Sequence, residues 1–225
     1  MRFRPVALSL IALLAGCAAV REPAAPGGRD QRMVQPASVA GVAEETFGKP
    51  TWGRQGEFSL HGQRVRYERG ADRIALFERL PAGVATPLRF SWAGPAGESA
   101  AVCEGWTPAG SGEPRPWVLS CRWGSAPAAM LQIGEGQRRG GQLSREGAYR
   151  RGELTVGLRS AHLAEGSAKP QATAIGYEML YQGTVVASLD LGGPVPRLRR
   201  PDPSTPLGRA VTEAALALAL ASDAR

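Results

Sequence analysis

Cysteine and histidine are the residues of this chain with the widest chemistry, and both are scarce. The 225 residues include three cysteines and two histidines, at Cys17, Cys103, Cys121, His61 and His162. A histidine beside a cysteine or a serine can act as the base of a nucleophilic site. No aspartate or glutamate stands at a motif spacing from either histidine, and both lie in turn-like sequence. We therefore predict that the histidines are solvated loop residues and that the chain is not an enzyme.

The stretch before Cys17 has the pattern of an export signal. Two arginines near the start precede an apolar run at 6–15, which is too short to span a bilayer. The run ends in Leu14-Ala15-Gly16-Cys17, which resembles the lipobox of bacterial lipoproteins. In that family the cysteine thiol accepts a diacylglyceryl group. The resemblance implies that residues 1–16 are a signal peptide and that Cys17 is the lipidated N-terminus of a membrane-anchored protein.

The residue after the cysteine bears on which membrane is involved. Lipoproteins held at the inner membrane typically have aspartate there, whereas this chain has Ala18. The resemblance therefore implies an outer-membrane lipoprotein. We predict that its domain faces the periplasm, with display at the cell exterior as the alternative. The alternative is an ordinary signal peptide cleaved near Gly16-Cys17-Ala18, which would leave Cys17 as a spare thiol.

The other two cysteines, Cys103 and Cys121, flank a loop at 107–116 that is rich in glycine, proline and serine. With Cys17 lipidated they form an even pair in an oxidising compartment, which predicts a disulfide; a reactive thiol is the alternative. Antiparallel pairing of the cysteines also predicts two opposed pairs, Trp106 with Val118 and Ala101 with Trp123. With all three cysteines assigned, too few ligands remain for zinc, so we predict no metal and no cofactor.

The formal net charge is +7, and only two of the 27 basic residues are lysines. Arginine binds phosphates and carboxylates through a bidentate fork. Nucleic acid is excluded as a partner because the protein is exported. Arginine clusters at 64–69 and 138–151 fit the solvent face of alternating strands. A third cluster, Arg197, Arg199 and Arg200, is a candidate contact for an anionic lipid head group or a polymer carboxylate.

The spacing of turn signals predicts a mainly β domain. Residues 17–45 have little periodicity and are predicted to be a flexible tether. From residue 46 to residue 225 we predict one domain, in which short runs of alternating apolar and polar residues are separated by turns about 8 to 12 residues apart. This pattern is typical of an antiparallel barrel or sandwich. Hairpin turns are predicted at 61–63, 146–147 and 182–183, and 73–80 fits a strand or a short helix.

The C-terminal stretch differs from the rest. Thr205-Pro206 provides an N-cap and a first-turn proline, so we predict a helix over about 206–222. From Ala214 to Ala221 the sequence is apolar on every side. Eight residues reach only about 12 Å, far less than a membrane span. A helix that is apolar all round is expected to be buried inside the protein.

Many strands followed by such a helix resemble the tubby-like and scramblase-like β-barrels, in which a hydrophobic C-terminal helix threads the barrel. The stretch from Gly176 to Ala187 is similar to the hairpins of that group. The resemblance implies that the helix lies inside a barrel. The alternative is another barrel or a sandwich in which the helix closes one end.

These observations leave three functional hypotheses. The first is a non-enzymatic outer-membrane lipoprotein whose β domain binds or scaffolds an envelope polymer, lipid or protein. The second is a carrier or sensor of a lipid or other apolar ligand, which requires that the helix does not fill the barrel. The third is an envelope hydrolase, for which the available residues offer the least support.

Overall fold

The computed structural model describes residues 31–48, 54–70, 83–108, 118–124, 126–134, 136–139 and 141–222. They contain one short 3-10 helix, η1 (Ala37–Val39), and one α-helix, α1 (Pro206–Ser222). The strands are β1 (Glu44–Thr46), β2 (Gln55–Leu60), β3 (Gln63–Arg69), β4 (Gly83–Gly94), β5 (Gly97–Pro108), β6 (Val118–Trp123), β7 (Ala129–Ile133), β8 (Gln137–Arg139), β9 (Gln142–Ser144), β10 (Glu146–Arg151), β11 (Leu154–Ala161), β12 (Gly176–Tyr181), β13 (Thr184–Asp190) and β14 (Arg197–Arg199).

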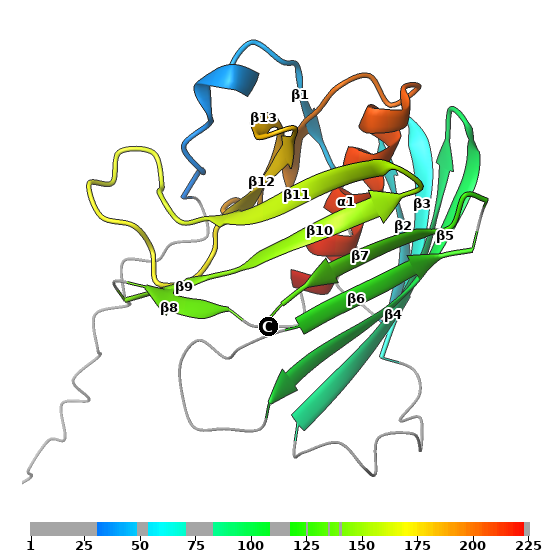
Figure 1. Ribbon diagram of the computed structural model, residues 1–225, viewed down its shortest axis with the longest axis horizontal. Helices are drawn as coiled ribbons and strands as arrows, with labels where there is room; N and C mark the ends of the chain where they lie inside the picture. Colours follow the sequence, from blue (N-terminus) through cyan, green and yellow to red (C-terminus); the bar gives the residue numbers. More distant parts are fainter. Residues whose placement is uncertain are drawn as a thin grey trace, which may run out of the picture.

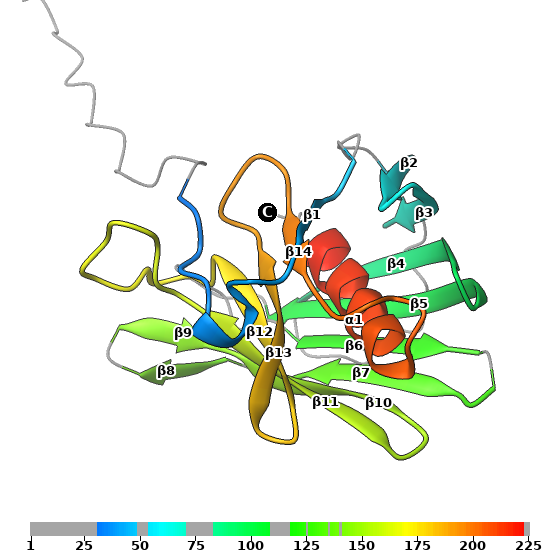
Figure 2. The same cartoon turned by 90° about the horizontal axis from the view of Figure 1, so that it is seen from above.

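Twelve of the described strands form one antiparallel sheet, in the order β1-β14-β13-β12-β11-β10-β7-β6-β5-β4-β3-β2. Its two edges meet, because Phe47, directly after β1, forms a bridge with Leu60 at the end of β2. Beside this bridge the Gly48 N–H donates to the Ser59 carbonyl at 2.6 Å. The sheet therefore curls into a nearly closed barrel around α1 (Figure 2). The predicted mainly β fold with one C-terminal helix is confirmed.

Two predicted hairpins are present, and their turn residues explain them. His61 and Gly62 join β2 to β3 with φ angles of 52° and 72°, and Gln182 and Gly183 join β12 to β13 with φ angles of 49° and 81°. Two consecutive positive φ values are the signature of the tight turn that matches the twist of paired strands. The alternating pattern of β3 fits its position in the wall, since Val65 and Tyr67 are buried and Arg66 between them is exposed.

The disulfide between Cys103 of β5 and Cys121 of β6 is present, and both cysteines are completely buried. The two residues are directly opposed in the ladder, and the predicted opposed pairs, Ala101 with Trp123 and Trp106 with Val118, also occur. The register of this hairpin was therefore readable from the sequence, because a disulfide and an alternating pattern both require the same alignment.

Helix α1 lies inside the barrel, which decides between the two positions that the sequence left open, inside a barrel or closing one end. The Thr205 hydroxyl accepts a hydrogen bond from the Gly208 N–H at 3.0 Å, which caps its N-terminus. Every residue from Ala210 to Leu220 is buried, with at most 4% of its surface exposed. The helix contacts β4, β5, β10, β11 and β13 of the wall, so it lies in the interior of the barrel (Figures 1 and 2). Within the described residues, no helix has the length and hydropathy needed to cross a membrane.

The predicted tether, 17–45, is wrong over its last part, because the described chain is built into the barrel from residue 31. It contains η1 and β1, and Met33 and Val39 are each 1% exposed. Met33 forms a bridge with Ala164, more than a hundred residues later in the chain. No sequence signal indicated this burial, because Met33 and Val39 follow neither a helical nor a strand period. They are buried by contacts with distant parts of the chain. The earlier part of the predicted tether lies outside the described residues.

The hairpin turn predicted at Glu146-Gly147 is also wrong, because both residues belong to β10, which pairs with β7 and β11. A Cβ on Gly147 would lie 2.2 Å from the carbonyl oxygen of Gln132 on β7. Gly147 is therefore needed because the two strands approach each other closely at this point. The sequence alone does not distinguish such a glycine from one in a turn. The predicted element at 73–80 lies outside the described residues.

Candidate functional site

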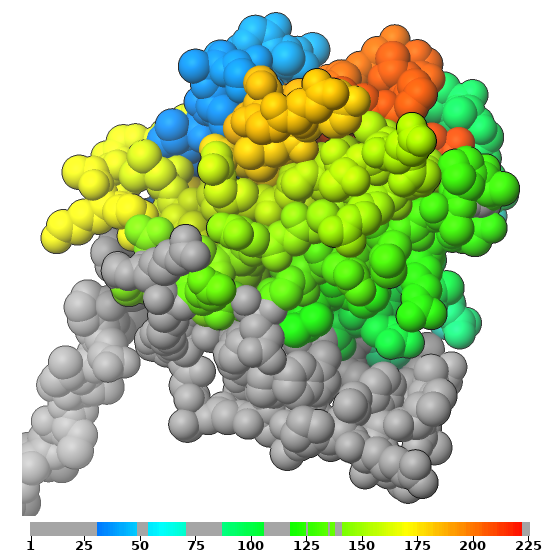
Figure 3. Space-filling model, viewed as in Figure 1, coloured from blue at the N-terminus to red at the C-terminus, as the bar shows by residue number. Residues whose placement is uncertain are grey.

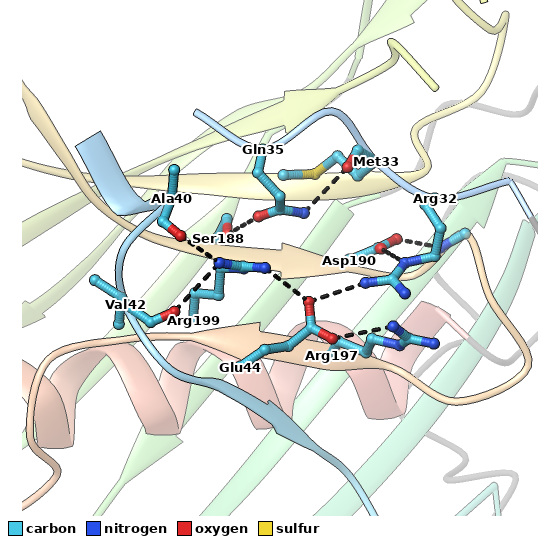
Figure 4. A network of polar contacts seen from close by, with 11 residues as sticks. Arg32, Met33, Gln35, Ala40, Val42, Glu44, Ser188, Asp190, Arg197 and Arg199 are labelled. Atoms are coloured by element: carbon cyan, nitrogen blue, oxygen red, sulfur yellow. Dashed lines mark hydrogen bonds and ion pairs between the residues drawn. The ribbon is translucent and has the colours of Figure 1, made fainter. Parts of the chain in front are cut away.

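The three arginines predicted to contact an anionic surface are brought together on and beside β14, next to β1. In the β1–β14 ladder, Arg199 lies opposite Glu44 and Arg197 lies opposite Thr46. The Glu44 carboxylate accepts hydrogen bonds from Arg197 Nη1 at 3.0 Å and from Arg199 Nη2 at 3.2 Å (Figure 4). An acidic residue of the first strand therefore neutralises part of this cluster from within the fold.

A fourth arginine, Arg32, joins the cluster from the segment before η1. Its Nη2 donates to Glu44 at 2.9 Å and its Nε donates to Asp190 of β13 at 2.9 Å (Figure 4). Arg199 in turn donates to the backbone carbonyls of Ala40 and Val42 at 2.9 and 3.2 Å. We call residues 31–47 the strap, because these bonds fasten them across β13 and β14.

The third predicted arginine, Arg200, is buried, with only 1% of its side chain exposed. Its Nε and Nη2 donate to the Glu45 carboxylate at 3.1 and 2.6 Å. His61, from the β2–β3 turn, lies with its Nδ1 3.5 Å from the other Glu45 oxygen and is 61% exposed. His61 is therefore a solvated turn residue, as predicted.

The predicted trio is thus assembled but paired with internal carboxylates. The side chains of Arg197 and Arg199 are 31% and 21% exposed. An external anion at this place would compete with Glu44 for the same donors. Contact of Arg197, Arg199 and Arg200 with an anionic surface stays a prediction.

A second polar cluster, which the sequence did not predict, lies inside the barrel around Glu213 of α1. Glu213 is completely buried. Its carboxylate accepts hydrogen bonds from Ser99 Oγ at 2.7 Å, from Arg151 Nη2 at 2.7 and 3.0 Å, from Arg209 Nε at 2.9 Å and from the Tyr149 hydroxyl. Burial, followed by the negative charge of Glu213, raises the pKa of Tyr149, so its phenol stays protonated and donates.

This cluster joins the helix to the wall of the barrel. Ser99 lies on β5, Tyr149 and Arg151 lie on β10, and Arg209 lies one turn before Glu213 on α1. A buried carboxylate is tolerated only where donors surround it, so these bonds specify the depth and rotation of the helix. The available sequence signal was a single glutamate in an otherwise apolar stretch, but nothing in the sequence identified its partners on distant strands.

His162 contradicts the prediction that both histidines are solvated, because it is only 7% exposed. Its Nδ1 lies 3.0 Å from the Gln171 carbonyl and its Nε2 lies 2.9 Å from Ser160 Oγ. Burial lowers the pKa of His162, which favours the neutral ring. A serine hydroxyl on a neutral imidazole is the pairing used by nucleophilic sites, but here the third group is a backbone carbonyl. Ser160 is only 8% exposed, so the pair joins the segment after β11 to the sheet.

The remaining predicted site residues are the cysteines. Cys103 and Cys121 form the disulfide in the core, and Cys17 lies outside the described residues. Among the residues that the structure describes, no group of three or more histidine, cysteine, aspartate or glutamate side chains is placed to hold a metal ion.

Comparison of the chain with protein-family models, with curated proteins and with solved structures finds no match. The resemblances to lipoproteins and to tubby-like or scramblase-like barrels therefore stay predictions.

Proposed function

We propose that this chain is an outer-membrane protein anchored by a lipid on Cys17, whose barrel binds or scaffolds another component of the envelope from the periplasmic side. The lipobox-like ending at Cys17 and the alanine that follows it motivate the address. The role is non-enzymatic. The barrel acts as a rigid body that presents its outer surface.

One observation favours this function over that of a carrier of apolar ligands: α1 occupies the interior of the barrel. A carrier barrel keeps its interior for the ligand, as eight-stranded barrels with one bound small molecule do. Here the side chains from Ala210 to Leu220 occupy that space. The Glu213 cluster also makes the helix costly to displace, since removal would strand a charge. Surfaces outside the barrel are therefore the places left for a partner.

The strap supports an anchored role. Three arginine–carboxylate contacts, with donor–acceptor distances of 2.9 to 3.2 Å, connect it to Asp190 of β13 and to Arg197 and Arg199 of β14. Hydrogen bonds between ionised groups are about twice as strong as neutral ones. A force applied to the barrel through the lipid anchor would therefore act on the strap, which these ion pairs hold against β13 and β14.

The address is tested by labelling cells with a radioactive fatty acid and separating their membranes on a sucrose gradient. We expect label and protein to travel together in the outer membrane, and Cys17→Ser to lose the label and leave that fraction. Ala18→Asp is the matched variant: it should keep the label and move the protein to the inner membrane. An unlabelled, soluble native chain would contradict the proposal.

The occupation of the barrel interior by α1 is tested by native mass spectrometry of the chain purified from the envelope. We expect the mass of the acylated chain alone, because α1 occupies the interior of the barrel. A stoichiometric apolar ligand that is released on unfolding would contradict the scaffold role and favour a carrier. Glu213→Gln serves as the comparison, since a weakened helix contact would increase the occupancy of a true lumenal site.

A further inference from the structure

The outward arginines of the barrel fall into two groups. Arg64 and Arg66 pair with Glu57 at 3.1 and 3.0 Å, and Arg159 pairs with Glu178 at 2.5 Å. Within the described part of the chain, Arg89, Arg122 and Arg150 are exposed and form no ion pair, and Arg54 is a fourth such arginine near the edge of the sheet. Uncompensated positive charge is therefore concentrated on a part of the outer wall.

The three unpaired arginines lie in one line across five neighbouring strands. Arg89 of β4 is opposite Val102 of β5, and Val102 is opposite Arg122 of β6. Arg122 is opposite Met130 of β7, which is opposite Arg150 of β10. We call these five residues the arginine row. Because neighbouring strands are about 4.8 Å apart, successive arginines of the row are separated by about 10 Å.

The row alternates cationic and apolar side chains that all face outward. Val102 is 53% exposed, one of the few large apolar side chains of the described chain that is so open. Met130 is half-buried between the two arginines that flank it. Among the described residues, Glu68 lies opposite Arg89 on β3, and Glu104 lies two residues from Val102 on β5. Neither of them forms an ion pair with the row.

A trough of small residues runs beside the arginine row. The next outward residue on each of the five strands, or just beyond its end, has a small side chain or none: Ser91, Ala100, Gly124, Ala128 and Gly152. Two hollows on the outer wall follow this line. One is lined by Arg89, Ser91, Ala100 and Val102, together with Arg66 and the acids Glu57 and Glu68 at its β2–β3 side. The other is lined by Arg122, Gly124, Ala128, Met130, Arg150 and Gly152. Figure 3 looks onto the outer face of β6, β7 and β10, where the second hollow lies.

We propose that the row and trough bind a linear envelope polymer that carries carboxylates, the chemical class to which peptidoglycan belongs. This inference rests on the proposed envelope location and names the partner of the proposed binding role. The unpaired guanidinium groups supply bidentate donors for carboxylates at intervals of about 10 Å. The trough receives the backbone of the chain, and Val102 and Met130 cover its apolar parts.

The trough favours a linear polymer over a membrane surface. A flat layer of lipid head groups would touch the tips of the arginines and leave the low line of glycine and alanine uncovered. A single extended chain fits both features, because it lies in the trough while its charged groups reach the row. An anionic bilayer is therefore the competing partner that the experiment must separate.

The experiment is co-sedimentation of the purified full chain, kept in detergent, with insoluble peptidoglycan sacculi. The test variant is Arg89→Gln/Arg122→Gln/Arg150→Gln. The matched control is Arg64→Gln/Arg159→Gln/Lys169→Gln, which removes the same amount of charge from exposed side chains that line neither hollow. We expect the row variant to bind at least about tenfold more weakly and the control to stay within about twofold of the native chain. Binding by the native chain should weaken with added salt.

Four outcomes would overturn the proposal: no sedimentation of the native chain, native-like binding by the row variant, equal losses in both variants, or capture by phosphatidylglycerol vesicles but not by sacculi. Equal losses would mean that net charge alone drives binding. Arg122→Gln, the central member of the row, provides a milder variant if the triple variant unfolds. The measurement uses purified protein, so its failure is distinguishable from a failure of the Cys17 fractionation.

Discussion

Replacing Glu213 by leucine is expected to lower the free energy of unfolding by about 3–5 kcal/mol, the usual result of removing one partner from a buried ionic cluster. The change leaves Arg151 beside Tyr149 inside the barrel without the carboxylate that compensates its charge. For a chain of this size the midpoint of thermal unfolding should fall by roughly 10 °C or more. Circular dichroism of the full chain during heating measures both the loss and the remaining strand content.

The control for this experiment is Glu153→Leu, because Glu153 is exposed in the turn between β10 and β11. It should change the free energy of unfolding by less than about 0.5 kcal/mol. A second comparison adds Arg151→Leu to Glu213→Leu. Removing both charges should recover part of the loss, since an apolar pair no longer leaves a charge unpaired. If Glu213→Leu were as stable as the native chain, the cluster would not be what positions α1.

Removing the disulfide is expected to lower the free energy of unfolding by about 3 kcal/mol, the chain-entropy value for a loop of this size. Cys103 and Cys121 are separated by 18 residues and join β5 to β6 in the middle of the barrel wall. Cys103→Ala/Cys121→Ala is the suitable variant, because alanine introduces no polar group into a site that is completely buried. Urea unfolding of the variant and of the native chain measures the difference.

A Cys17→Ser background makes the effect specific, because only the cysteines of the barrel then respond to a reductant. In that background the native barrel with dithiothreitol and the double alanine variant without it should unfold at similar urea concentrations. A barrel whose unfolding midpoint did not change with reductant would contradict the prediction. A change in the slope of the unfolding curve would instead indicate an altered unfolded state.

Local patterns predicted a large part of the fold. The alternation around Val65 and the paired turn residues at 61–62 and 182–183 were sufficient for two hairpins, since strand period and turn geometry are properties of a few adjacent residues. The cap at Thr205 placed the start of the helix for the same reason. The apolar surface all round the helix required burial, but only the tertiary structure showed that the helix lies inside the barrel.

Local patterns were insufficient where a residue's role depends on a distant partner. Arg32 bonds Asp190 across 158 residues, and Arg200 bonds Glu45 across 155. The three arginines of the predicted cluster do lie together, on and beside β14, but their pairing with the carboxylates of the strap was not predicted. His162 was assigned to a solvated loop because the segment that buries it, near Gln171, returns to the sheet only through tertiary contacts.

The sequence by itself determined the strand and helix periods, the two tight turns, the pairing of Cys103 with Cys121 and the burial of the last helix. It also carries the lipobox-like motif at Cys17, whose use stays a prediction. Only the tertiary structure decided that the strap closes the barrel, that Glu213 has partners on β5 and β10, and that Arg89, Arg122 and Arg150 form one row. The physical reason is that backbone preferences act over a few residues, whereas ion pairs and cross-strand rows are formed by register and chain closure across the whole domain.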